Sequence, residues 1–144
     1  MKLSSILSGL GLALVVGVVL LLIMGVHFQR PLPERGAALY NAATETIVRG
    51  TVTEVSDFAC PVSEGEIGSH LKLQTATGVV LVHLAPARIM RGQNLSFAPG
   101  DQLVVVGSQA RMLGKQDLIA REVERGNETL IFRDAAGKLM LTQY

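Results

Sequence analysis

Two of the three histidines of this chain, His70 and His83, are the residues whose chemistry and spacing could suit a metal ion. His70 and His83 lie on either side of a short turn-like segment, and Cys60, the only cysteine, precedes both. Imidazole nitrogens are common ligands of transition metals and of haem iron. A closed zinc site needs four ligands, so two histidines alone are too few. Either Cys60 or a nearby carboxylate would have to complete a site; the candidate acids are Asp57, Glu64 and Glu66.

Three interpretations of these histidines stay open. In the first, His70 and His83 bind a metal ion or contact haem. In the second, both are solvated residues on the surface of a β-structure, and the protein has no cofactor. In the third, they contact a partner. We expect Cys60 to be an inert thiol, because its charged neighbours in the sequence are acidic and a reactive cysteine needs a cationic setting. Lys72, close to His83 in the predicted hairpin, also argues against a bound cation.

No other motif indicates catalysis or nucleic-acid binding. The chain has no HExxH, P-loop or GxGxxG motif and no CxxCH haem-attachment motif. A single cysteine excludes an internal disulfide and a four-cysteine zinc site. With 13 basic and 12 acidic residues and 4% aromatic residues, the chain lacks the basic excess and the stacking platforms of nucleic-acid-binding proteins. We therefore expect a protein that is not an enzyme and does not bind nucleic acid.

The segment from residue 68 to residue 86 predicts a β-hairpin that positions both histidines. Its alternating apolar residues are Leu71, Leu73, Val82 and Leu84. With a two-residue turn at Thr77-Gly78, Leu71 pairs with Leu84, the apolar residues share the core face and both histidines share the opposite face. With a three-residue turn at Ala76–Gly78, the histidines lie on opposite faces. Turn chemistry favours the second register and burial favours the first, which we expect.

Strand-like patterns cover most of the chain after residue 44. The predicted strands are 44–55, 70–75, 79–84, 102–112 and 117–124, followed by a hairpin of 128–134 and 138–142. We expect an acidic loop over 56–68, a helical turn over 86–94, and a bulge or tight bend at Gly50. Five strands with a helical element after the third is the order of an OB-fold. The sequence therefore predicts an all-β, five-stranded OB-fold-like barrel with an extra C-terminal hairpin.

An apolar segment precedes this domain. Residues 3–26 carry no charged side chain, and at about 1.5 Å per residue they can cross a bilayer core of roughly 30 Å as a helix. The apolar run is too long for a signal peptide and no cleavage site follows it. We expect one N-terminal transmembrane helix (1–28), a linker (29–43) and a periplasmic domain (44–144). Because the flanking positive charges nearly balance, a cytoplasmic domain on the same anchor is the alternative.

Small residues in the apolar segment would let another helix approach closely; they are Gly9, Gly11, Ala13 and Gly17. The expected partners are therefore the lipid bilayer and other subunits of a membrane complex. Our leading hypothesis is a single-pass protein of the bacterial inner membrane that acts as a non-catalytic accessory or assembly subunit and binds protein partners. The alternative is a metal- or haem-handling periplasmic protein that uses His70 and His83.

Several segments resemble a known family: GTVTEV, GSHLKLQTATGVVLVHLAPA, FAPGDQLVVVGS and LIAREVERGNETLIFRDAAG. Over roughly residues 45–141 the chain is similar to the C-terminal OB-like domain of the magnetosome MamS/MamX family. The resemblance implies a small exported bacterial domain associated with magnetite formation. Related haem-bearing members carry CxxCH, which this chain lacks, so the resemblance implies no electron-transfer role here. No functional residue is carried over from the family.

Overall fold

The computed structural model describes residues 39–141. Its regular elements are η2 (Ala42–Thr44), β1 (Glu45–Ala59), η3 (Pro61–Ser63), β2 (Ile67–Thr75), β3 (Gly78–Pro86), α2 (Ala87–Gly92), β4 (Gln102–Met112), β5 (Lys115–Arg125) and β6 (Glu128–Ile131). The predicted anchor (1–28), most of the linker, and the residues Gly9, Gly11, Ala13 and Gly17 lie outside this range. Within it, no helix has the length and apolar character needed to span a membrane.

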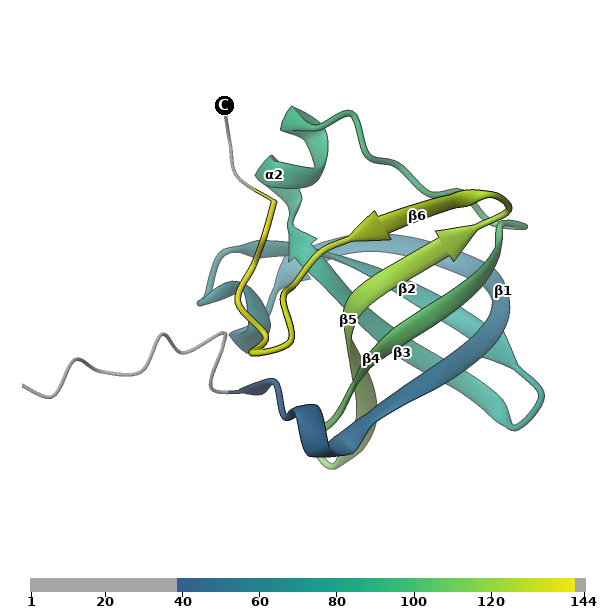
Figure 1. Ribbon diagram of the computed structural model, residues 1–144, viewed down its shortest axis with the longest axis horizontal. Coiled ribbons are helices and arrows are strands. Elements are labelled where there is room, and N and C mark those ends of the chain that lie inside the picture. Colours follow the sequence, from purple (N-terminus) through teal and green to yellow (C-terminus); the bar gives the residue numbers. More distant parts are fainter. Residues whose placement is uncertain (1–38, 142–144) are drawn as a thin grey trace, which may run out of the picture. The chain divides into compact units, whose positions relative to one another are not determined.

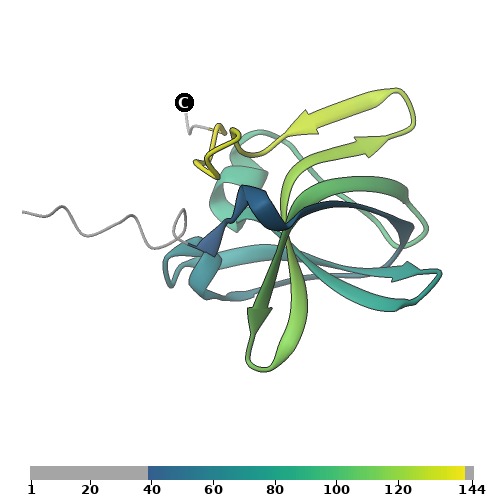
Figure 2. The same cartoon turned by 60° about the horizontal axis from the view of Figure 1, so that its bottom comes forward.

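The strands close into a ring. The sheet order is β3-β2-β1-β4-β5-β6, and β3 also pairs in parallel with β5, so that the first five strands form a barrel (Figures 1 and 2). All other strand pairs are antiparallel. This connectivity, with α2 between β3 and β4, is that of an OB-fold. The predicted OB-fold-like barrel is therefore confirmed, and ring closure leaves few exposed strand edges.

β1 is long and changes partner along its length. It pairs with β4 up to Thr51 and with β2 from Thr51 onward. Gly50 lies at this corner, where a Cβ atom would come within 2.4 Å of the carbonyl oxygen of Gln74. The glycine therefore permits the close approach of two strands, and the bulge lies further on, between Val52 and Glu54.

The predicted loop over 56–68 is wrong in extent. β1 continues through Ala59 and pairs with the start of β2, so the connection covers only residues 60–66. The polar residues at the end of β1 gave no strand pattern, but the sheet satisfies them. Asp57 accepts a hydrogen bond from Ser69 at 2.6 Å and forms an ion pair with Arg91 at 3.1 Å.

The barrel interior is apolar. Its buried residues are Val52, Leu71, Leu73, Val82, Leu84, Ala85, Met90, Phe97, Leu103, Val105, Leu118, Ala120, Val123 and Phe132. The four apolar hairpin residues predicted for the core are all among them. Met90 comes from α2, so the helix contributes to the same core, as the predicted helical turn after β3 allows.

Neither predicted register of the β2–β3 hairpin is correct. The turn residues are Ala76-Thr77, and Thr75 pairs with Gly78. The Thr75 hydroxyl donates to the Gly78 carbonyl at 2.7 Å, and Gly78 has a φ of 137°, which a side chain would disfavour. The hydrogen bond of Thr75 and the backbone conformation of Gly78 thus place the turn one residue earlier than the expected Thr77-Gly78 turn.

This register still keeps the histidines together. His70 pairs directly with His83, whereas Leu71 pairs with Val82 and not with Leu84. Because the shift from the expected register is two residues, each side chain keeps its face. The shared face of the two histidines is confirmed, and their separation is smaller than expected because they are opposite neighbours.

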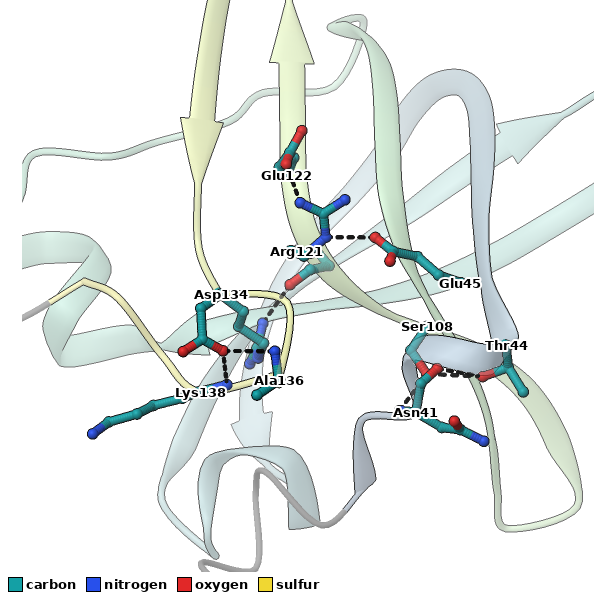
Figure 3. A network of polar contacts seen from close by, with 11 residues as sticks. Asn41, Thr44, Glu45, Ser108, Arg121, Glu122, Asp134, Ala136 and Lys138 are labelled. Carbon is teal, nitrogen blue, oxygen red and sulfur yellow. Dashed lines mark hydrogen bonds and ion pairs between the residues drawn. The ribbon is translucent and has the colours of Figure 1, made fainter.

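Polar contacts tie both ends of the described chain to the barrel (Figure 3). Asn41 N donates to Ser108 Oγ at 2.9 Å, and Arg121 Nε donates to Glu45 Oε1 at 2.5 Å. At the other end, Asp134 accepts two backbone hydrogen bonds within a turn. The predicted C-terminal hairpin is thus only partly present. β6 (part of the predicted segment 128–134) pairs with β5, and a single bridge, Arg133 with Leu139, closes the turn.

Candidate metal centre

Cys60, His70 and His83 converge on one point outside the barrel core. Cys60 directly precedes η3, His70 lies on β2 and His83 lies opposite it on β3. One ligand atom from each residue, Sγ or a ring nitrogen, lies within 4.8 Å of the other two. The exposed fractions are 5%, 0% and 3%. The three residues therefore form a buried cluster, which we call the Cys–His–His cluster.

The outer face of the hairpin is covered here. The Phe58 ring stacks on the His70 ring with centroids 3.7 Å apart, and the His83 ring meets the His70 ring edge-on at 4.7 Å. A second, smaller apolar cluster adjoins them, made of Tyr40, Cys60, Val62 and Ile119. The interpretation of both histidines as solvated surface residues is therefore wrong. The end of β1 and the 60–66 connection fold over the strands and exclude water.

Asp117 orients His83. The parallel pairing of β3 with β5 places Asp117 beside His83, with Nε2 3.1 Å from Oδ2. A carboxylate accepts hydrogen bonds only, so Nε2 carries the proton and the Nδ1 lone pair is free. Nδ1 is buried and has no partner among the described residues. This is how a carboxylate commonly prepares a histidine ligand for a metal.

His70 has no hydrogen-bond partner within the described part of the chain. Both of its ring nitrogens are buried and unpaired. A neutral imidazole carries one donor and one acceptor, and leaving such a group unsatisfied in the interior costs about 1–3 kcal/mol. Unsatisfied buried polar groups are rare in native proteins and often indicate an ion or a functional role. The position of His70 is thus that expected of a ligand histidine.

The surroundings of Cys60 lower the pKa of its thiol. Burial raises the pKa of its thiol, but the side chains of His70, His83 and Ser63 lower it, and the result is a pKa of about 5. Only the contact from Cys60 Sγ to Ser63 Oγ, at 3.6 Å, has hydrogen-bond geometry. The expectation of an inert thiol is therefore not supported: the residues that surround Cys60 in space are imidazoles.

The acidic residues expected as alternative ligands are directed elsewhere. Asp57 binds Ser69 and Arg91, and Glu66 forms an ion pair with Arg88 at 2.7 Å. Glu64 is exposed in the turn after η3 and is not part of the cluster. Of the ligands left open by the sequence, the structure therefore brings Cys60 to the two histidines and not a carboxylate.

Gly68 makes room for the cluster. A Cβ atom on this residue would lie 2.4 Å from Ser63 Oγ, 3.1 Å from Cys60 Sγ and 3.2 Å from His70 Cε1. Contacts this short force neighbouring atoms to move. The backbone of β2 therefore approaches the thiol and the imidazole more closely than any other residue type allows.

A cavity of about 980 Å³ borders the cluster. Its lining residues include Phe58, Cys60, Val79, Leu81, His83, Met112, Leu113 and Asp117. Lys72 lies at this cavity too, but its Nζ is 2.6 Å from Glu54 Oε2. The lysine charge that argued against a bound cation is thus balanced by a carboxylate.

The geometry suits a bare ion better than haem. With metal–ligand bonds of roughly 2.0–2.3 Å, the ligand atoms of a three- or four-coordinate site lie about 3.5–4 Å apart. The ligand atoms of the cluster lie within 4.8 Å of one another, within about 1 Å of that separation. A haem plane, in contrast, has no access to His70, because this residue is fully buried between the rings of Phe58 and His83 and other side chains.

The ring of five strands and the helix after β3 define a small OB-fold-like β-barrel protein. The chain belongs to the MamS/MamX magnetosome protein family, whose profile matches residues 44–130. This confirms the resemblance noted from the sequence.

Among solved structures, the chain is similar to a chain of the S. pombe Stn1–Ten1 complex, at 17% identity and a TM-score of 0.45. That match covers 58% of this chain and 59% of the other. It is also similar to the OBody NL8 bound to hen egg-white lysozyme, at 20% identity and a TM-score of 0.42, with 59% and 96% covered. No curated protein sequence matches the chain.

Proposed function

We propose that this protein binds one transition-metal ion through Cys60, His70 and His83, as a non-catalytic OB-fold module. The observation that carries the proposal is the pair of unpaired, fully buried nitrogens on His70, in a cluster whose ligand atoms from Cys60, His70 and His83 lie within 4.8 Å of one another. A metal ion satisfies one of these nitrogens and the free Nδ1 of His83. It also compensates the charge that Cys60 carries as a ligand, which is costly to bury without a partner. A bound cation would therefore satisfy buried groups of the cluster that have no other partner among the described residues.

The chain's own residues supply ligation and orientation. The Cys60 thiolate provides a soft, charged ligand, and the two imidazoles provide neutral ligands of intermediate softness. Asp117 holds His83 in the tautomer that leaves Nδ1 free. Phe58 limits the movement of the His70 ring. No group in the cluster is placed as a general acid or base toward a substrate, so we propose binding and not catalysis.

We further propose that the domain is carried by a single N-terminal membrane anchor and lies in the periplasm, at the bacterial inner membrane. The uncharged segment over residues 3–26 supports the anchor. Membership of a magnetosome protein family agrees with a membrane-associated bacterial protein. A protease added to intact spheroplasts should digest the domain if it is periplasmic and should spare it if it is cytoplasmic.

The metal proposal is tested on the full-length chain purified in mild detergent. After incubation with an excess of Zn(II), Cu(I) or Fe(II) in separate samples, and after desalting, elemental analysis should find one ion per chain for at least one metal. The His70→Ala/His83→Ala double variant should retain none. The matched control is His27→Ala, which removes the third histidine and leaves the Cys–His–His cluster intact. Equal metal retention by the double variant and the wild type would contradict the proposal.

A second candidate function is that of an accessory subunit that binds protein partners. The observation in its favour is a group of exposed apolar side chains, Phe58, Val79 and Leu113, that line the same cavity. Leu113 is fully exposed at a hairpin tip. In affinity purification from the native membrane, Leu113→Ser should lose partners that a control, Ile131→Ser on β6, retains. Recovery of the wild-type chain alone as a monomer would contradict this candidate.

A further inference from the structure

We infer that the ion of the Cys–His–His cluster is copper(I), held by Cys60 Sγ, His83 Nδ1 and one ring nitrogen of His70, with its open side toward the cavity. The inference rests on the proposed metal binding and specifies the ion. It is carried by the number of ligands and by the polarity of the surroundings.

The number of ligands is too small for a closed zinc site. Zinc in structural sites takes four protein ligands in a tetrahedron, whereas the described residues bring three together. The nearest carboxylate, that of Asp117, is engaged by the Nε2–H of His83. Copper(I) accepts fewer ligands, and a soft thiolate is a ligand that it shares with zinc. The oxygen ligands that would favour harder cations are directed away from the cluster.

The surroundings are apolar and soft. Phe58 covers His70, and Val62 and Ile119 pack beside Cys60 in the small apolar cluster. Met112 packs against the small apolar cluster and lines the cavity that Cys60 and His83 also border. A setting of low polarity favours the lower charge of a metal ion, because it provides little solvation for a higher one.

Direct competition between metals tests the inference. The full-length protein in mild detergent, kept anaerobic, is equilibrated with equal concentrations of Cu(I), Zn(II) and Fe(II), each buffered by a chelator of known affinity. After desalting, copper should be retained at one ion per chain, with an affinity at least about ten-fold above that for zinc, which corresponds to 1.4 kcal/mol. Cys60→Ser should abolish this preference, and His27→Ala should preserve it.

Asp117→Asn provides a more conservative variant in case Cys60→Ser does not fold. It keeps the shape of the side chain and should weaken Cu(I) binding by about 10–100-fold, as the loss of an orienting carboxylate does elsewhere. Preferential retention of zinc or iron would overturn the copper inference and leave the metal-binding function intact. Retention of no metal by the wild type would overturn both.

Discussion

The two faces of the β2–β3 hairpin differ in how their buried groups are satisfied. The face toward the barrel carries Leu71 and Val82, which need only apolar neighbours and have them. The opposite face carries His70 and His83, equally buried, with three ring nitrogens that no described residue satisfies. The inner face therefore stabilises the metal-free protein, whereas part of the outer face destabilises it.

This difference separates residues that stabilise the fold from residues whose burial suits a function. An apolar core gains free energy from burial itself, at roughly 25 cal/mol per Å². A buried imidazole without a partner loses about 1–3 kcal/mol, and only an additional ligand recovers that loss. Substitutions on the inner face should therefore lower the free energy of unfolding and leave metal binding unchanged. Substitutions of the histidines should abolish metal binding and leave the free energy of unfolding nearly unchanged.

The largest effect is expected in the barrel core. Phe132 is fully buried there, and Phe132→Ala should lower the free energy of unfolding by about 3–5 kcal/mol through lost burial and the cavity left behind. Urea unfolding of the full-length protein measures this. Ile131→Ala, at an exposed neighbour, serves as the control and should change stability by less than about 0.5 kcal/mol. In samples that remain folded, the metal affinity of Phe132→Ala should equal that of the wild type.

A pair of glycines sharpens the comparison. Gly68→Ala and Gly50→Ala each introduce a Cβ atom within 2.4 Å of another atom, and each should destabilise the fold by about 1–3 kcal/mol. Only Gly68 borders Cys60 and His70, so only Gly68→Ala should also weaken metal binding. Titration of both variants with Cu(I) distinguishes them. Equal metal affinity in the two variants would argue against a site at the cluster.

The smallest effect is expected at the β4–β5 turn. Leu113 and Gly114 both have positive φ, 49° and 78°, as in the two-residue turns that favour Asn-Gly. Leu113→Asn should therefore stabilise the protein by about 0.5–1 kcal/mol, seen as a higher urea midpoint. If Leu113 contacts a partner, the same variant should bind that partner less well. A loss of stability would show that the exposed leucine contributes to the fold.

The barrel was largely predictable from the sequence, and the cluster only in part. Alternating apolar residues identified the core of the hairpin, and the element order identified the ring. Histidines on one face also followed from alternation. The contributions of Phe58 and Asp117 did not, because they depend on how far β1 extends and on the parallel contact between β3 and β5. The parallel contact arises from ring closure, which no local sequence pattern encodes.

The register was missed for a local reason. Burial fixes which face a side chain takes but does not distinguish registers that differ by two residues. Hydrogen bonds of Thr75 and the positive φ of Gly78 decided the turn. The position of Cys60 was missed as well, because it follows from the short connection at residues 60–66. The end of β1 is polar and has no strand pattern, so its pairing with β2 could not be predicted.

The most direct test of the central claim compares the wild type with His70→Leu, each with and without Cu(I), by urea unfolding of the full-length protein. Without metal, His70→Leu should match or exceed the wild type by up to about 1 kcal/mol, since the substitution removes an unsatisfied polar group. With free Cu(I) at 100 times the dissociation constant, the wild type should gain about 2.7 kcal/mol and the variant should gain nothing. A metal-free variant that is several kcal/mol less stable, together with no effect of Cu(I) on the wild type, would contradict the account.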